Sequence, residues 1–244
     1  MTSAPITEQR LLIDLQQLDS QLARLGHERA HLPALSHIEH TIKRLKDNKR
    51  AAVLAAAALT DARAEATRAE TEVDQVVRRA QTLRERLSAG TAAARDLSAI
   101  QGEIDQLGRR QAVLEDKQIS AIESVESAQA QVDELAAQEQ EIRAAGRELT
   151  AVRDTEFARI DAETAALRAR RDELVARISP ALLEEYEAVR ARTGGLGAVA
   201  LHDRRLEGAA IEISPAEHAR IAAAPADAII HAEENDVIIV RMDI

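Results

Sequence analysis

The sequence predicts a mainly α protein, in which a long, kinked antiparallel coiled-coil hairpin is followed by a small β module. Three observations predict this fold class. Apolar residues recur at alternating spacings of three and four over most of residues 6–178. Aromatic residues are only 1% of the 244 residues and charged residues are 30%, which does not suit one large compact core. Short β-like runs begin only after residue 194.

The first arm of the hairpin is expected over residues 6–88, with one interruption. Pro33 lacks a backbone donor and predicts a break, after which a second helix opens near Ser36. Gly90 suits the position after a helix end and Thr91 suits an N-cap, so the chain is expected to reverse over residues 88–92. The first helix carries leucines at the a and d spacing of a coiled coil: Leu11, Leu15, Leu18, Leu22 and Leu25.

The second arm is expected over residues 92–178 and is nearly as long as the first. Folding the chain back at Gly90 pairs residues whose numbers sum to about 180. This register places Pro33 opposite Gly146 and predicts a kink shared by both arms. It also places a basic run, Lys43, Arg44, Lys46, Lys49 and Arg50, opposite or close to the acidic residues Asp133, Glu134, Glu139 and Glu141.

Complementary flanking charges favour an intramolecular hairpin, and an extended intermolecular coil is the alternative. A monomer and a homodimer are both compatible with the pattern. The expected domains are the hairpin, residues 1–178, and a C-terminal module, residues 179–244.

The C-terminal module is expected to open with a short helix at Ser179-Pro180. Gly194, Gly195 and Gly197 then predict a flexible joint; a phosphate-binding loop is disfavoured because the lysine and hydroxyl of that motif are missing. A capping box opens a further short helix at residues 214–217. The β-like runs lie at residues 198–201, 210–213, 229–232 and 237–240.

Composition limits the compartment and the partners. The chain has no cysteine, no apolar run long enough for a membrane span and no visible signal peptide, so a cytoplasmic protein without a membrane partner is expected. The net charge of -10 weighs against indiscriminate nucleic-acid binding, which depends on lysine and arginine.

Several short segments, in this order and spacing, give the chain a family resemblance. They are LQQLD at residues 15–19, LSAIQGEI at 97–104, EYEAVR at 185–190 and IIVR at 238–241. Together they resemble the bacterial C4-type zinc-ribbon, coiled-coil hairpin family. In that family CxxC pairs occupy the places held here by Leu206 with Ala209 and by Ala232 with Asn235. Without any cysteine, metal binding is not carried over, and no cofactor is expected.

The resemblance implies an adaptor role, and we expect a non-enzymatic scaffold that binds another protein through its stalk or its metal-free ribbon. No catalytic constellation is recognisable in the sequence. The alternative is an RNA- or nucleic-acid-binding adaptor that uses the basic run Lys43, Arg44, Lys46, Lys49 and Arg50.

Histidines near Pro33 form two pairs at helical spacing, His27 with His31 and His37 with His40. Such pairs can bind metal or respond to pH, but solvated polar residues beside a helix break are the favoured reading. The tail histidines His202, His218 and His231 are expected to be surface residues.

Overall fold

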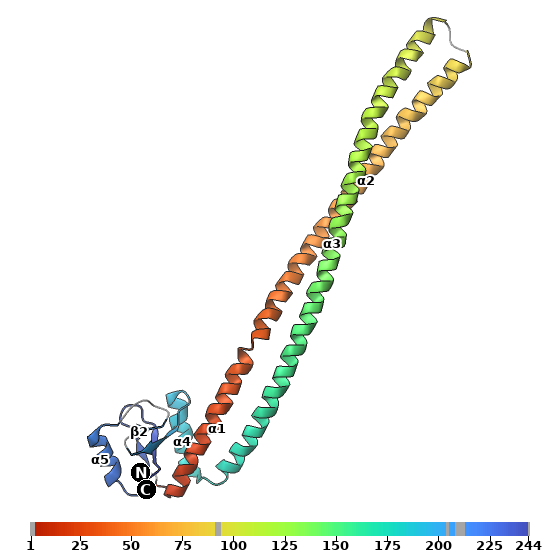
Figure 1. Ribbon diagram of the computed structural model, residues 1–244. Helices are drawn as coiled ribbons and strands as arrows, with labels where there is room; N and C mark the ends of the chain where they lie inside the picture. The colour runs from red at the N-terminus through yellow and green to blue at the C-terminus, as the bar shows by residue number, and fades with distance from the viewer. Residues whose placement is uncertain (1–2, 91–93, 204, 208–212, 244) are drawn as a thin grey trace. The chain divides into compact units, whose positions relative to one another are not determined.

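The computed structural model describes residues 3–90, 94–203, 205–207 and 213–243 (Figure 1). The predicted fold class is confirmed, since most of the chain is helical, a long helical hairpin is formed and the C-terminal residues form a small four-stranded sheet. The elements in chain order are α1 (Ile6–Ala30), α2 (Pro33–Ser88), α3 (Ala94–Val175), α4 (Pro180–Thr193), β1 (Ala198–His202), β2 (Arg205–Leu206), α5 (Pro215–Ala223), β3 (Ile230–His231) and β4 (Ile238–Arg241).

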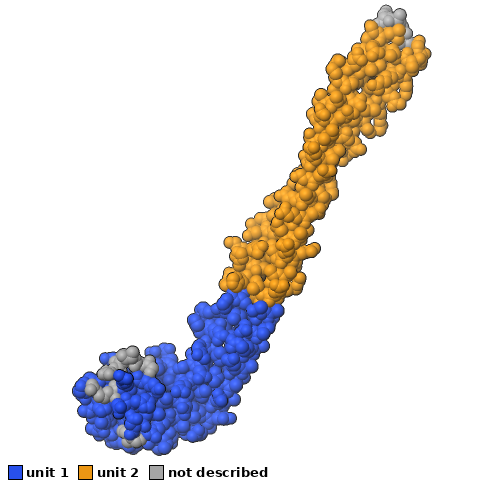
Figure 2. Space-filling view, in the orientation of Figure 1, with its two compact units in different colours: residues 1–35, 151–244 blue, residues 36–150 orange. Residues whose placement is uncertain are grey.

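The chain divides into two compact units, coloured separately in Figure 2. Unit 1 combines residues 1–35 with residues 151–244, and unit 2 comprises residues 36–150. The predicted boundary at residue 178 lies inside unit 1. No helix in the described part of the chain has an apolar stretch capable of spanning a bilayer.

Unit 2 consists of antiparallel stretches of α2 and α3 that pack along a narrow seam (Figure 1). Its buried residues alternate between alanine and larger aliphatic side chains on α2 and are mostly large on α3. They are Ala55, Leu59, Ala69, Val76, Ala80 and Leu83 on α2, and Ile100, Ile104, Leu114, Ala121 and Ile142 on α3.

The first arm breaks near Pro33, as predicted, but the proline itself begins the next helix. Pro33 is the first residue of α2, a position that tolerates proline because the backbone N–H there has no helical acceptor. The predicted match across the arms is wrong. A Cβ on Gly146 would lie 3.5 Å from the Cγ2 of Thr41, so Gly146 lies beside Thr41 rather than Pro33. α3 is one continuous helix from Ala94 to Val175, so the helix is not interrupted at Gly146 as the first arm is near Pro33.

Unit 1 is built around a sheet with strand order β2-β1-β4-β3. β1 pairs parallel to β4, while β1–β2 and β3–β4 are antiparallel. Alternate residues of β1 enter two cores, as the pleat requires. Ala198 and Ala200 pack with Leu12, Leu15 and other residues of α1, α3 and α4, whereas Val199 and Leu201 pack in a second cluster with α5.

Three of the predicted β runs coincide with β1, β3 and β4. The fourth, at residues 210–213, lies mostly outside the described residues, as does the predicted N-cap Thr91; Ile213 itself is buried but lies in no strand. The predicted capping box is confirmed, since the Ser214 hydroxyl accepts a hydrogen bond of 3.1 Å from the Glu217 N–H. A short strand at β2 was not predicted.

Candidate functional site

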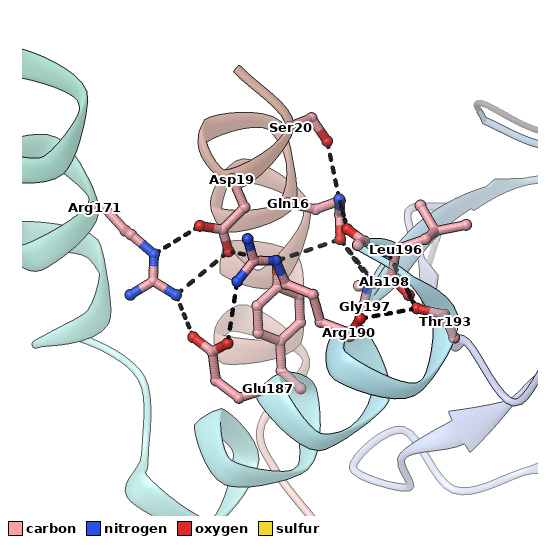
Figure 3. Close-up of polar contacts among 12 residues, drawn as sticks. Gln16, Asp19, Ser20, Arg171, Glu187, Arg190, Thr193, Leu196, Gly197 and Ala198 are labelled. Carbon is pink, nitrogen blue, oxygen red and sulfur yellow. Dashed lines mark hydrogen bonds and ion pairs between the residues drawn. The ribbon is translucent and has the colours of Figure 1, made fainter. Parts of the chain in front are cut away.

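A buried polar network joins α1 to α3 and α4 within unit 1 (Figure 3). Asp19 of α1 is only 2% exposed. Its carboxylate accepts hydrogen bonds from Arg171 Nε at 2.7 Å and from the Tyr186 hydroxyl at 2.9 Å. Glu187 of α4 contacts Arg171 as well, and Arg190 lies 3.5 Å from Asp19. A buried carboxylate is stable only when paired in this way.

The network is electrostatically matched. The hydrogen bond to Asp19 raises the pKa of Arg171 above its ordinary value, in spite of partial burial, so the guanidinium stays charged. Burial, reinforced by the neighbouring Asp19 carboxylate, raises the pKa of Tyr186 well above its ordinary value. The phenol therefore keeps its proton and donates a hydrogen bond to Asp19. These groups hold three helices together.

Gln16, one turn before Asp19, fixes the chain that follows α4 (Figure 3). Its Oε1 accepts from Gly197 N–H at 2.6 Å and its Nε2 donates to the Gly195 carbonyl at 2.9 Å. Gly194 has φ 75° and Gly195 φ 124°, the left-handed region that glycine favours. The segment predicted as a flexible joint is therefore a hydrogen-bonded turn.

Of the four positions where the resemblance places zinc ligands, two lie in one apolar cluster and one lies in a turn. Leu206 and Ala232 belong to the same apolar cluster, which also contains Val199, Ile221 and Ile239. Asn235 lies in the turn between β3 and β4, where its side-chain oxygen accepts from Val237 N–H at 3.3 Å. Ala209 lies outside the described residues. Within the described part of the chain, no group of three or more histidine or acidic side chains is arranged to hold a metal ion.

His231 of β3 lies between two acidic residues of unit 1. Its Nε2 is 2.8 Å from Glu185 of α4, and its Nδ1 is 3.0 Å from the Asp236 carbonyl. Burial lowers the pKa of His231, but the hydrogen bonds to Asp236 and Glu185 outweigh it and raise the pKa above its ordinary value. Contrary to expectation, this histidine is a structural contact between α4 and the sheet.

The basic run is exposed on α2 in unit 2. None of its five side chains forms an ion pair within the described part of the chain, so the predicted pairing with α3 is wrong. The acidic residues that were expected opposite contact their own helix instead: Glu139 pairs with Arg143 at 2.7 Å, and Asp133 accepts from Gln129 at 2.9 Å. The five basic residues are Lys43, Arg44, Lys46, Lys49 and Arg50.

The register between the two arms is close to the predicted one but not constant. Near the tip, Arg79 pairs with Glu103 at 2.9 Å, and these numbers sum to 182, close to the predicted 180. Beside the basic run, Thr41 lies against Gly146, and the sum has risen to 187. Asn48 and Leu135 sum to 183 and Arg63 and Gln129 to 192, so the contacts between the arms scatter on one side of the predicted sum.

Four of the five cations share one side of α2. Lys43, Lys46, Lys49 and Arg50 recur at helical spacing, whereas Arg44 projects about 100° away from Lys43. The buried Asn48, between them in sequence, points to α3 and donates to the Leu135 carbonyl at 3.3 Å. The cations therefore face solvent on the opposite side.

Exposed aliphatic side chains lie on the same side of α2. Ile42 is 49% exposed, Val53 70% and Leu54 66%. The apolar spacing places Ile42 in the predicted seam, which the structure contradicts, whereas Val53 and Leu54 fall between the predicted seam positions Ala52 and Ala56. We call the set the α2 outer face: Ile42, Lys43, Lys46, Lys49, Arg50, Val53 and Leu54.

The chain resembles known proteins over nearly its whole length. It is 34% identical over 241 residues to an uncharacterized protein of Mycobacterium tuberculosis, covering 98% of each chain. A solved structure from Mycobacterium smegmatis matches with a TM-score of 0.82 and 31% identity, covering 98% of this chain and 100% of that one. CT398 from Chlamydia trachomatis shares the fold, with a TM-score of 0.64 at 14% identity over 96% of this chain and 97% of its own.

A family model points the same way. The model of the CT398-like coiled coil hairpin domain matches residues 15–194. This range contains most of the hairpin and the buried network of Gln16, Asp19, Arg171 and Tyr186, and it ends at the first glycine of the turn after α4. The chain therefore belongs to the CT398-like coiled coil hairpin domain family.

Proposed function

We propose that this protein is a non-enzymatic cytoplasmic adaptor that binds an acidic protein partner through the α2 outer face. The observation that carries the proposal is a solvent-facing helix side on which four cations are flanked by large exposed aliphatic side chains, Ile42 at one end and Val53 and Leu54 at the other. Exposed apolar side chains that are rimmed by charge are typical of protein interaction sites. The cations of this face have no ion-pair partner in the described part of unit 2, so an acidic partner would not displace an existing contact.

The exposed apolar residues, the lack of exposed aromatic residues and the net charge favour a protein partner over a nucleic-acid partner. Val53 and Leu54 offer apolar area that a phosphate backbone cannot use. Single-stranded nucleic acids stack on exposed aromatic side chains. Tyr186 is buried and Phe157 lies 4.1 Å beneath the Arg29 guanidinium, and the chain has no other aromatic residue of the Phe, Tyr or Trp type. The net charge of -10 adds a repulsive background.

A charge-reversal experiment tests the proposal. Wild-type protein and the triple variant Lys43→Glu/Lys46→Glu/Lys49→Glu are used to capture partners from an extract of the source organism, with and without nuclease. The matched control is Arg109→Glu/Arg110→Glu/Lys117→Glu, which makes the same charge change at exposed positions of α3 in the same unit. We expect a protein that survives nuclease treatment, is lost with the α2 variant and is kept with the control.

The apolar side chains are tested separately with Val53→Ser/Leu54→Ser. This variant keeps every charge and is expected to weaken capture of the same protein by about tenfold, which corresponds to roughly 1.4 kcal/mol. Equal capture by wild type and both α2 variants would contradict the proposal.

The second candidate function is nucleic-acid binding, which is favoured by five cations that form no ion pair with any described residue. If phosphates occupy the basic run, affinity for single-stranded RNA should fall steeply with salt, and removing three cations should reduce the slope of log K against log salt by about 2. Fluorescence anisotropy over a salt series measures this slope. Capture that disappears with nuclease, together with this slope change, would replace the first proposal by the second.

We also infer that the C-terminal module is a metal-free counterpart of a zinc ribbon. Support comes from Leu206 and Ala232, which occupy one apolar cluster where the resemblance places thiolate ligands. Apolar packing then does what four metal–sulfur bonds do in a tetrathiolate site. Elemental analysis after dialysis tests this, and one retained zinc per chain would contradict it.

A further inference from the structure

His27 lies on the last turn of α1, and His31 caps the C-terminal end of this helix. Their spacing of four residues places both side chains on one side of the helix. The two imidazole rings are stacked, with centroids 3.9 Å apart and planes inclined by 25°. Both residues are exposed. The buried Leu25 faces the α1–α3 seam of unit 1, and a side chain two residues later projects to the opposite side.

The contact of His31 with the backbone determines which nitrogen of its neutral ring carries the hydrogen. Its Nδ1 lies 2.9 Å from the His27 carbonyl oxygen, which also accepts the His31 backbone N–H at 3.0 Å. Because a carbonyl oxygen only accepts, Nδ1 must carry the hydrogen and donate it. In the neutral ring Nε2 then carries the lone pair. In metal-binding histidines, the ring nitrogen that does not bind the metal commonly donates its hydrogen to a carbonyl or carboxylate oxygen in the same way.

The neighbouring charged side chains are occupied elsewhere. Glu28 contacts Arg159 of α3, and Arg29 pairs with Asp161 at 3.1 Å while its guanidinium covers the Phe157 ring. These contacts hold the last turn of α1 against α3 within unit 1. The two histidines are left on the outer side with no ion pair in the described part of the chain.

We propose that His27 and His31 form a two-histidine site for a divalent late transition metal, namely Zn²⁺, Ni²⁺ or Cu²⁺. Imidazole suits these ions, whereas Mg²⁺ and Ca²⁺ prefer oxygen ligands. While the Nδ1 hydrogen bond holds the His31 ring, rotation of the exposed His27 ring about its side-chain bonds directs its Nε2 to the ion bound by Nε2 of His31, and water completes the coordination. The ion joins two residues one turn apart, immediately before the break between α1 and α2, and so it stabilises the end of α1.

The site is open to water and differs in kind from the four-thiolate site of a zinc ribbon. Its ion is exchangeable and is removed by dialysis against a chelator. Metals compete with protons for imidazole, so binding should weaken at about pH 5. A zinc ion that survives dialysis would therefore contradict the metal-free C-terminal module and would not test the His27–His31 site.

Calorimetric titration of the full chain with Ni²⁺ tests the proposal. The variants are His27→Ala and His31→Ala, and the matched control is His37→Ala/His40→Ala, which removes the other pair near the break. We expect each single variant to lose on the order of tenfold in affinity or more, because the second ligand acts intramolecularly. The control should bind as wild type does, and Mg²⁺ should not bind.

Nuclear magnetic resonance supplies a second readout. Zn²⁺ should shift the ring protons of His27 and His31 and leave those of His37 and His40 unchanged. Circular dichroism confirms that the variants stay folded, as expected for exposed residues. Unchanged Ni²⁺ affinity in both single variants, or loss of binding in the His37/His40 control, would overturn the proposal.

Discussion

Gly197 illustrates how a single residue positions the C-terminal module. A Cβ at this position would lie 2.4 Å from Cε2 and 2.6 Å from Cδ2 of the Tyr186 ring. Tyr186 is fully buried and its hydroxyl is held by Asp19, so the ring cannot retreat. Gly197→Ala is expected to destabilise the protein by about 1–3 kcal/mol through overpacking.

Urea unfolding measures this loss, and Gly26 provides the control in the same unit. Nothing lies within 4 Å of a Cβ built on Gly26, which is inside α1. Gly26→Ala should therefore stabilise by roughly 0.5–1 kcal/mol, because alanine favours the helix. A neutral Gly197→Ala variant would show that Tyr186 has room to move.

His231 makes the stability of unit 1 depend on pH. Its pKa is raised in the folded state, so the stabilising contribution is complete below the unfolded value, near 6.5, and is lost as pH rises through the folded pKa. The difference in unfolding free energy between wild type and His231→Gln should be larger at about pH 5.5 than at about pH 8.5. Glu185→Gln should reduce this pH dependence, because it removes the carboxylate 2.8 Å from the ring. A pH-independent difference would contradict the assignment.

At the scale of elements, Asp19 determines how α1 packs with α3 and α4. Asp19→Asn leaves Arg171 and the Tyr186 hydroxyl around a neutral side chain in a site that is 2% exposed. Breaking a buried ion pair by removing one partner costs about 3–5 kcal/mol. Denaturant unfolding should show a loss of this order.

The control for Asp19→Asn is Asp161→Asn, which breaks an ion pair with Arg29 at the surface of the same unit. Exposed pairs contribute at most about 1 kcal/mol, so the control should change stability little. Equal losses in the two variants would mean that burial of Asp19 has no special energetic role.

The local parts of these elements were predictable from sequence, and the polar network was not. Ser214 and Glu217 form the predicted cap because both partners lie three residues apart in sequence. Pro33 ends one helix and begins the next for equally local reasons. In the sequence, Gln16 and Asp19 stand out only as part of LQQLD, residues 15–19, one of the segments that carry the family resemblance. Their polar character at seam positions, where leucine alternates, was the available signal.

At the scale of the whole chain, long-range register was beyond the sequence pattern. Residues in contact across the arms were expected to have numbers that sum to about 180; the sum is 182 for Arg79 with Glu103 and 187 for Thr41 with Gly146, so the fold-back point alone does not specify each contact. The parallel pairing of β1 with β4 joins residues about forty positions apart, and neither strand's alternation specifies its neighbour. The α2 outer face could not be predicted, because the sequence does not show that Glu139 and Asp133 contact residues of their own helix.

The composition of unit 1 leads to a last prediction, about the boundary expected at residue 178. The main core combines Leu12 and Leu15 of α1 and Leu174 of α3 with Leu182 and Tyr186 of α4. A fragment of residues 179–244 would expose this apolar surface and lose the Asp19 hydrogen bond to Tyr186. We expect the fragment to show no cooperative thermal transition by circular dichroism, since small domains have little core to spare. The full chain should unfold cooperatively under the same conditions. A cooperative transition of the fragment would instead establish residues 179–244 as an independent domain, and the α1 contacts would then be an interface between domains rather than a shared core.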